Sequence, residues 1–252
     1  MLVLCYGIQK SGSTLAFELV RGVLESAGFE QPFLRNERFK GDVSIPAAAR
    51  NYVEGVTQEK IVELTDIIGP DRKIAVKTHG GFRAKMFPWL EEMQARAALQ
   101  IIVSWRDPRD ICLSLLDAGV AARDIDAGAF SQLKTLDDAV AYVEGRLARY
   151  RKWASLRGTL RLDYDIAAFA PDRAIAAIEK TLNVASDHER VKRHAFEDAD
   201  TRKNKALPDR YRTELSAGQK TKLADTFRRF IMDSSDAGWP EKHRLKLLAR
   251  ER

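Results

Sequence analysis

Three short segments carry side chains that suit the binding or transfer of anionic groups. The first, Gly7-Ile-Gln-Lys-Ser-Gly-Ser-Thr14, combines glycines with a lysine and three hydroxyl groups. If a helix begins at about Thr14, its first backbone N–H groups and its positive dipole end favour a phosphate. Lys10 precedes Gly12 here, whereas in the Walker motif the lysine follows the second glycine. The segment therefore predicts a phosphate site without the usual Mg²⁺ arrangement, and an ordinary strand-to-helix turn is the alternative.

The second segment places His79 two residues after Lys77 and directly before Gly80 and Gly81. An unperturbed imidazole has a pKa of ~6.5, which suits a general base near neutral pH. The glycines would let a substrate approach the ring, although a structural histidine is the alternative. The other histidines lie in charged segments and are expected at the surface: His188, His194 and His243.

The third segment places Arg106 and Arg109 on either side of Asp107-Pro108. Two guanidinium groups favour an anion site in which the aspartate orients one of them. The same aspartate also resembles the Mg²⁺-holding carboxylate that follows a strand in many nucleotide hydrolases. Ser114 comes eight residues after Arg106, two turns into the next expected helix. Both side chains would reach one phosphate if that helix begins beside it.

These segments follow apolar runs that read as buried strands. Polar and apolar residues do not alternate in these runs, which is typical of strands that are covered on both faces. The expected strands are Leu2–Tyr6, Ile74–Lys77, Leu99–Ser104 and Thr159–Leu162. Strands that alternate with helices predict an α/β fold, a single domain with a mainly parallel central sheet and helices on both faces. Ligands of such sheets bind at the carboxyl ends of the strands, where the three segments lie.

The helices are predicted from apolar periodicity and from capping residues. One begins near Thr14 with Gly28 as its C-cap. The others are expected over 58–68, 84–97, after Arg109 through Leu116, 135–155, after Pro171, and 217–232. Thr135 and Ser216 have capping-box spacing to Asp138 and Gln219. Residues 118–134 are small and polar and predict a mobile loop, and a charged loop is expected after the helix that starts at Pro171.

Composition restricts the class of protein. The chain has 252 residues, of which 45% are hydrophobic and 31% charged, as in a soluble globular domain and unlike a disordered chain or a coiled coil. Apolar runs are too short for a membrane-spanning helix, and the start lacks the features of a secretory signal, so we expect a cytoplasmic protein. Cys5 and Cys112 are expected to be buried thiols, and no metal site is expected.

The formal net charge is +6, and half of this excess lies in residues 241–252, which hold five basic and two acidic residues. The remaining charge is spread over the rest of the chain and is weak for a nucleic-acid surface. We therefore expect a domain at 1–240 that is followed by a basic tail at 241–252, and no nucleic-acid partner.

Together the segments resemble the sulfotransferase family that uses 3′-phosphoadenosine 5′-phosphosulfate (PAPS). Lys10-Ser-Gly-Ser-Thr14 resembles the family's Lys-Ser-Gly-Thr-Thr loop, and Lys77-Thr-His79 is similar to its Lys-Thr-His element. Arg106-Asp-Pro-Arg-Asp-Ile-Cys-Leu-Ser114 resembles its Arg-x-Pro-x-Asp-x-x-x-Ser element, and Tyr164-Asp165 its Tyr-Glu-Asp segment. The resemblance covers residue 2 to about 120 and about 159 to 216, with gaps, and implies a P-loop nucleotide hydrolase-like fold.

The resemblance implies transfer of a sulfuryl group from PAPS to a hydroxyl or amine, with adenosine 3′,5′-bisphosphate (PAP) as product. It implies His79 as general base and Lys10 as a catalytic cation. The residues implied to contact the donor are Lys10, Ser11, Gly12, Ser13, Thr14, Leu15, Lys77, Arg106, Ser114, Tyr164, and the closing-loop residues Arg202, Lys203 and Asn204. Gln9 and Leu15 depart from the family pattern. Gln9 stands where proline is usual, and Leu15 stands where cytosolic members stack a tryptophan on adenine. Stacking would then fall to Trp105 or Tyr164.

No motif identifies the acceptor, which is expected to be a small molecule, a sugar or a lipid. The oligomeric state is also not indicated by any motif. Residues 31–70 and 118–155 match nothing in the family and are expected to contribute to the acceptor side. Two rival functions stay open. A nucleotide-dependent kinase would need Asp107 as its Mg²⁺ ligand, and a nucleotide- or RNA-binding module would use a basic patch formed by Arg202, Lys203, Lys205, Arg210 and Arg212.

Overall fold

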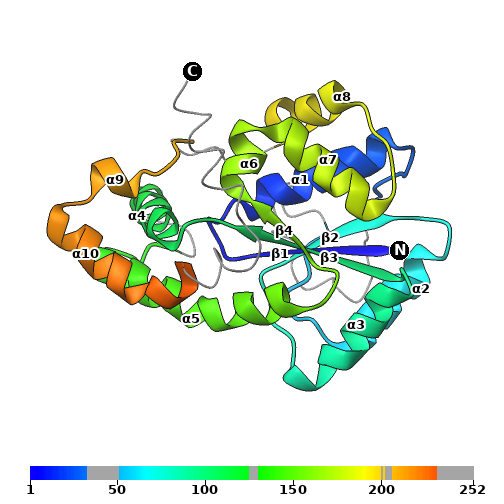
Figure 1. Cartoon of the computed structure of the whole chain (residues 1–252), viewed down its shortest axis with the longest axis horizontal. Helices are drawn as coiled ribbons and strands as arrows, with labels where there is room; N and C mark the ends of the chain where they lie inside the picture. Colours follow the sequence, from blue (N-terminus) through cyan, green and yellow to red (C-terminus); the bar gives the residue numbers. More distant parts are fainter. Residues whose placement is uncertain (33–50, 125–129, 200, 202–205, 232–252) are drawn as a thin grey trace. The chain divides into compact units, whose positions relative to one another are not determined.

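The computed structural model describes residues 1–32, 51–124, 130–199, 201 and 206–231 (Figure 1). The candidate residues Arg202, Lys203 and Asn204, His243 and the basic tail at 241–252 lie outside the described residues, as does most of the expected acceptor segment before residue 51. Within the described part of the chain, no helix is both long and apolar enough to cross a lipid bilayer.

A four-stranded parallel sheet forms the centre of the fold, in the order β2-β1-β3-β4. Its strands are β1 (Leu2–Gly7), β2 (Ile74–Thr78), β3 (Leu99–Trp105) and β4 (Leu160–Asp163). Each lies within a residue of its expected position. Tyr6 pairs in register with Thr78, and Gly7 pairs with Ser104, so the three strands end level with one another. The three candidate segments therefore begin at the same edge of the sheet.

One face of the sheet is covered by the first helix and by four elements from residues 164–198 (Figure 1). They are α1 (Ser13–Ser26), α6 (Tyr164–Phe169), α7 (Pro171–Leu182), α8 (His188–Arg193) and the π-helical turn η4 (His194–Asp198). The predicted apolar stripe of α1, with Leu15, Leu19 and Val23, packs into the core on this side. Val3 and Cys5 of β1 point to the same core, as the two-residue period of a strand requires.

The opposite face is covered by α2 (Gln58–Ile68), η3 (Ala84–Met86), α3 (Phe87–Ala95) and the end of α5 (Leu136–Ser155). Tyr6 of β1 points to this side, where its ring stacks on Trp153 of α5 with the centroids 5.5 Å apart. The predicted α/β fold, a parallel sheet with helices on both faces, is confirmed.

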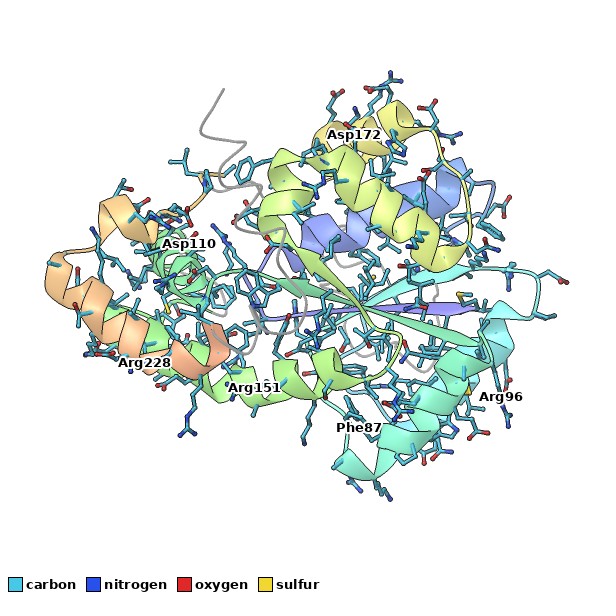
Figure 2. The ribbon with its side chains drawn as sticks, viewed as in Figure 1. Phe87, Arg96, Asp110, Arg151, Asp172 and Arg228 are labelled. Carbon is cyan, nitrogen blue, oxygen red and sulfur yellow. The ribbon has the colours of Figure 1, made fainter. Side chains whose placement is uncertain are left out.

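The chain divides into two compact units, 1–106 with 148–208 and 107–147 with 209–252. The sheet belongs to the first. The second contains α4 (Pro108–Asp124), the start of α5, α9 (Tyr211–Glu214) and α10 (Ala217–Thr226). Within it, Asp110 of α4 (Figure 2) accepts a hydrogen bond from the Tyr211 backbone N–H at 2.9 Å. Both predicted capping boxes are present, at Thr135 and at Ser216.

Two expectations about loops are wrong. Residues 118–124, expected to be loop, continue α4, because Gly119 permits a close approach instead of ending the helix: an added Cβ would lie 2.5 Å from the Leu133 carbonyl oxygen. The charged segment after α7 forms α8 and η4, with Asp187 as N-cap of α8. The helix α6, which was not predicted, begins at Tyr164 and is capped by Asp163.

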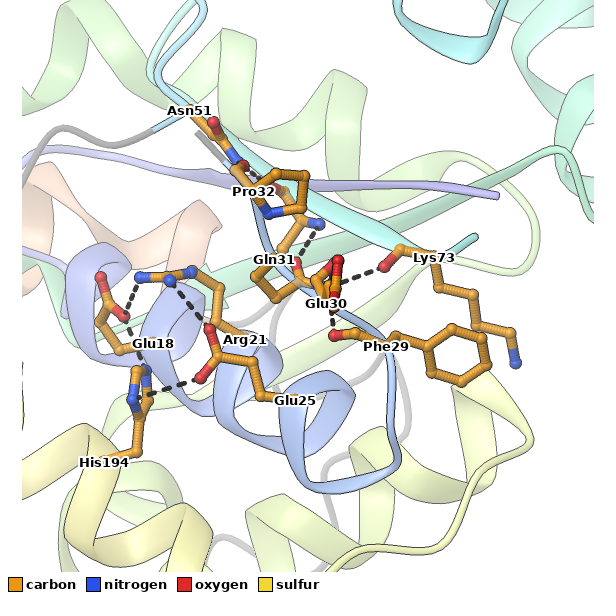
Figure 3. A network of polar contacts seen from close by, with 11 residues as sticks. Glu18, Arg21, Glu25, Phe29, Glu30, Gln31, Pro32, Asn51, Lys73 and His194 are labelled. Carbon is orange, nitrogen blue, oxygen red and sulfur yellow. Dashed lines mark hydrogen bonds and ion pairs between the residues drawn. The ribbon is translucent and has the colours of Figure 1, made fainter. Parts of the chain in front are cut away.

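His194 does not behave as the surface residue that was expected. Its Nε2 lies 3.0 Å from Glu18 Oε2, and its Nδ1 lies 3.7 Å from Glu25 Oε2 (Figure 3). Arg21 of α1 pairs with both carboxylates at 3.0 Å, and Glu18 and Arg21 are buried. The network fixes η4 against the outer side of α1, the helix that carries the glycine-containing loop at its start.

Candidate anion-binding site

The loop between β1 and α1 ends in a helix start that lacks a cap. Gly12 occupies the N-cap position with φ of 80°, no side chain caps this end, and no acidic residue lies in the first turn. Thr57, Asp163, Asp187 and Ser216 cap the starts of α2, α6, α8 and α10, whereas α3, α7 and α9 also begin without a side-chain cap. The first N–H groups of a helix need an acceptor from outside the helix, and an anion supplies one.

The backbone of this loop is unusual at Lys10, which has φ of 68°. A residue with a Cβ is disfavoured in this left-handed region by roughly 1–2 kcal/mol. Such residues persist where their surroundings hold them, often at ligand sites. Here the guanidinium of Arg106 donates to the Lys10 carbonyl oxygen at 3.3 Å. A buried side chain from the end of β3 thus contacts the strained residue.

Hydroxyl groups line the inner side of the loop. Ser11 and Ser104 have their Oγ atoms 2.8 Å apart, and both side chains are buried. Ser104 pairs in register with Gly7, where an added Cβ would lie 2.1 Å from the Ser104 Oγ and 2.6 Å from the Ser13 Cβ. Gly7 is therefore required by close packing around the loop.

Lys77 brings a second cation to the start of α1. Its Nζ donates to the Thr14 Oγ1 at 2.6 Å, and the side chain is buried although it carries charge. The contact spans two neighbouring strands, since Lys77 lies on β2 and Thr14 follows β1. The positive charge of Lys77 therefore reaches the helix start from the sheet.

The imidazole of His79 is oriented by the end of β1. Its Nδ1 lies 2.6 Å from the Gly7 carbonyl oxygen. A carbonyl oxygen only accepts hydrogen bonds, so Nδ1 carries the proton, and in the neutral ring Nε2 has the lone pair. The ring of Tyr52 lies beside the imidazole, with the centroids 5.7 Å apart. This tautomer is the one in which His79 can accept a proton at Nε2.

Arg106 is a buried cation without a carboxylate partner among the described residues. Only 7% of the residue is exposed, and its buried Nε has no hydrogen-bond partner. Its guanidinium carbon lies 4.2 Å from the centroid of the Tyr164 ring. That ring also covers Gly12, where an added Cβ would lie 2.3 Å from the Tyr164 Cδ2. A buried charge is costly unless it is paired, so this arrangement favours an anionic ligand.

The structure thus brings most of the predicted residues together at one edge of the sheet. They are Lys10, Ser11, Gly12, Ser13, Thr14, Lys77, His79, Arg106 and Tyr164. Leu15 does not join them, because it packs into the core beneath α1. Ser114 is buried on α4, in the second compact unit. Trp105, the other candidate for adenine stacking, is buried at the end of β3.

Asp107 orients a guanidinium, as the sequence predicted. Arg109 donates through Nε to Oδ1 at 2.9 Å and through Nη2 to Oδ2 at 2.6 Å. Although burial opposes the charged form, the carboxylate raises the pKa of Arg109. The Arg109 guanidinium also lies over the Tyr211 ring, 3.6 Å from its centroid. Both oxygens of Asp107 are therefore engaged in fixing Arg109.

The expected buried thiols are confirmed. Cys5 and Cys112 are both buried and free, and burial raises the pKa of each thiol. Neither thiol is suited to act as a nucleophile near neutral pH. Among the described residues, no group of three or more His, Cys, Asp or Glu side chains has the arrangement of a metal site.

Sequence reasoning missed four residues that contact the site. Ser104 could have been found, because it ends a predicted strand next to the one that enters the glycine loop. Tyr52 pairs with Lys77 through an isolated β-bridge. The residues around Tyr52 form no strand pattern and lie far from Lys77 in the sequence, so this pairing could not be predicted. Arg149 and Trp153 of α5 donate to the carbonyl oxygens of His79 and Gly80, about 70 residues away.

Comparison with known proteins relates the fold to that of sulfotransferases. No protein-family model and no curated protein matches the chain. Among solved structures, mouse sulfotransferase SULT7A1 complexed with PAP superposes with a TM-score of 0.54 at 12% identity, over 100% of this chain and 88% of that one. The sulfotransferase domain of the Synechococcus PCC 7002 olefin synthase has a TM-score of 0.45 at 15% identity, over 90% of this chain and 94% of that one. A sulfotransferase from Alicyclobacillus acidocaldarius has a TM-score of 0.42 at 14% identity, over 91% of this chain and 95% of that one. At these identities the likeness to SULT7A1 is one of fold.

Proposed function

We propose that this protein is a sulfotransferase that uses PAPS as donor. The observation that carries the proposal is Arg106, a buried guanidinium without an ion pair to any described residue, next to the uncapped start of α1. Both features favour an anion, and they adjoin each other because the Arg106 guanidinium, which follows β3, donates to the Lys10 carbonyl oxygen in the loop before α1. A ligand with anionic groups at two positions, such as a nucleoside 3′,5′-bisphosphate, satisfies both.

The residues around the loop fit the parts of such a donor. The N–H groups at the start of α1, with Lys10 and the hydroxyls of Ser11 and Thr14, suit the 5′-phosphosulfate. Arg106 suits the 3′-phosphate, and the ring of Tyr164 supplies an aromatic face for adenine. The likeness of the fold to a sulfotransferase whose structure contains PAP agrees with this fit. Ser114, Arg202, Lys203 and Asn204 are assigned to the donor from their motifs alone.

The tautomer of His79 fits the role of general base. An acceptor O–H or N–H would give its proton to Nε2, because Nδ1 already carries one. As the acceptor atom bonds to sulfur, the bond from sulfur to the bridging oxygen breaks and PAP leaves. Lys10 and the loop N–H groups stabilise the charge that grows on that oxygen, which is preorganised electrostatic stabilisation. Lys77, fixed on Thr14, adds positive charge at the same place.

A comparison of four nucleotides tests the donor. We expect PAP to raise the melting temperature of the protein more than AMP or ATP at equal concentration, because only PAP has phosphates at both positions of the ribose. Coenzyme A, which carries a 3′-phosphate with a bulky 5′-diphosphate extension, is the fourth ligand and tests the space at the loop.

Stabilisation by AMP equal to that by PAP would contradict the proposal, because Arg106 would then have no 3′-phosphate to bind. A larger effect of ATP that depends on Mg²⁺ would favour a kinase. That function is less well supported, since Arg109 engages both oxygens of Asp107, the carboxylate that a kinase would need for Mg²⁺.

A nucleic-acid-binding module is also less well supported. Arg210, one of the cations of the supposed basic patch, is buried and pairs with Asp117 and Glu214 at 2.7–2.8 Å. Arg212 lies 3.3 Å from Asp209. The described part of the patch therefore offers little free charge to a phosphate backbone. Binding that falls steeply with salt and ignores the 3′-phosphate would favour the module.

A further inference from the structure

Two side chains of α5 hold the loop that carries His79. Arg149 donates from Nη1 to the His79 carbonyl oxygen at 3.1 Å, and Trp153 donates from Nε1 to the Gly80 carbonyl oxygen at 3.0 Å. The donors are four residues apart, so they lie one above the other on the same face of the helix. Consecutive carbonyl groups of a loop are thus tied to one rigid element.

The packing of Trp153 is the first observation that shows α5 to be firmly attached to this loop. The residue is fully buried, and its ring stacks on Tyr6 of β1 with an interplanar angle of 25°. Phe82, which follows the loop, meets the same ring edge-on with the centroids 4.5 Å apart. Since Tyr6 directly precedes Gly7, α5 contacts both the loop of His79 and the strand end that supplies the hydrogen-bond acceptor for its imidazole.

The second support is the space at the glycines of the loop. An added Cβ at Gly80 would lie 2.0 Å from the Glu54 carbonyl oxygen, and one at Gly81 would lie 3.0–3.2 Å from the side chain of Arg149. The sequence predicts that these glycines leave room for a substrate. Instead the chain at Glu54 and the side chain of Arg149 occupy that space, so the loop is packed on two sides.

We propose that Arg149 and Trp153 are positioning residues that fix the tautomer of His79. The hydrogen bond from Nδ1 to the Gly7 carbonyl selects the ring form in which Nε2 accepts a proton. That bond requires the backbone of residues 79–81 to keep its place relative to β1, and α5 supplies the restraint. Neither residue touches the reacting groups in this account. Only the consequence for turnover rests on the proposed sulfotransferase function.

Nuclear magnetic resonance of the imidazole nitrogens tests the proposal without an acceptor substrate. Long-range ¹H–¹⁵N spectra distinguish the protonated nitrogen from the unprotonated one, and His79→Gln assigns the signals among the four histidines. We expect a single Nδ1–H form in the wild-type protein. Trp153→Phe keeps an aromatic ring but removes the N–H donor together with part of the buried indole, and Arg149→Gln shortens an exposed side chain without changing the core. Each variant should show a mixture of the two tautomers.

Arg151→Gln is the matched control, because Arg151 is an exposed arginine on the same helix (Figure 2). Its His79 signals should equal those of the wild type. Arg149→Lys keeps a donor and a charge and should recover part of the Nδ1–H form. If the wild-type tautomer is unchanged in Arg149→Gln, which has no reason to misfold, the proposal is wrong even if Trp153→Phe does not fold.

Kinetics then separate this proposal from the proposed function. A base displaced by about 1 Å slows turnover roughly 10²-fold. We therefore expect Arg149→Gln to lower kcat by roughly 10- to 100-fold while its affinity for PAP is unchanged. If the wild-type protein does not bind PAP, sulfotransfer is wrong, but a tautomer change in Arg149→Gln still supports the positioning of His79.

Discussion

Among single side chains, His79 is the one whose contacts specify its protonation most closely. The sequence indicated a histidine at the end of a strand, and it could equally have been structural. The 2.6 Å contact of Nδ1 with the Gly7 carbonyl decides which nitrogen carries the proton, and hence where a proton can be accepted. Gly7 belongs to β1 and His79 follows β2, so this detail depends on pairing between strands that are distant in the sequence.

The proposed role of His79 as general base predicts that its loss separates donor binding from turnover. His79→Ala should lower kcat by roughly 10²- to 10⁴-fold, the usual contribution of a general base, while PAP still binds. Steady-state kinetics and calorimetric titration measure the two quantities. His188→Ala, a substitution on α8, serves as control and should keep wild-type turnover. Normal turnover in His79→Ala would remove the imidazole from the mechanism.

At the level of helices and strands, the sequence predicted what local patterns encode. The stripe of α1 and the capping boxes at Thr135 and Ser216 were found because each is complete within a few residues. α8 was missed because it is charged throughout and buries only Val191, so it has no apolar period. The end of α4 was missed because Gly119 reads as a breaker, although tertiary packing against Leu133 requires it.

The contact between α7 and α8 gives the protein a predictable dependence on pH. His188 lies 3.1 Å from Asp172 and 3.2 Å from Glu179. Burial opposes its charged form, but hydrogen bonds to Glu179 and Asp172 outweigh burial and raise the pKa of His188. The folded state therefore holds this proton more tightly than the unfolded state. The stabilisation is complete below the unfolded pKa of ~6.5 and is lost as pH rises through the raised value.

We therefore expect the wild-type protein to lose more stability between pH 5.5 and pH 8.5 than His188→Gln does. For a partly exposed pair the difference should be at most about 1 kcal/mol. Chemical denaturation at both pH values measures it. An equal change in the two proteins would show that the pair contributes no pH dependence.

At the level of the whole fold, the order of the strands explains why three separate segments form one site. β1 lies between β2 and β3, so the loop after β1 meets Lys77 and His79 from one neighbour and Ser104 and Arg106 from the other. The sequence predicted this meeting, because parallel strands end at a common edge. It did not predict that Tyr164 covers Gly12 or that α5 holds the His79 loop. Such contacts depend on side-chain packing between elements far apart in the chain.

The central claim is that Arg106 and the start of α1 bind the two anionic ends of one nucleotide. Calorimetric titration of PAP and AMP into the wild type and Arg106→Gln tests it most directly. We expect the substitution to weaken PAP by roughly 1.5–3 kcal/mol, the value of a charge-assisted hydrogen bond, and to leave AMP nearly unchanged. Equal weakening of both nucleotides would contradict the claim, because Arg106 would then not distinguish the 3′-phosphate.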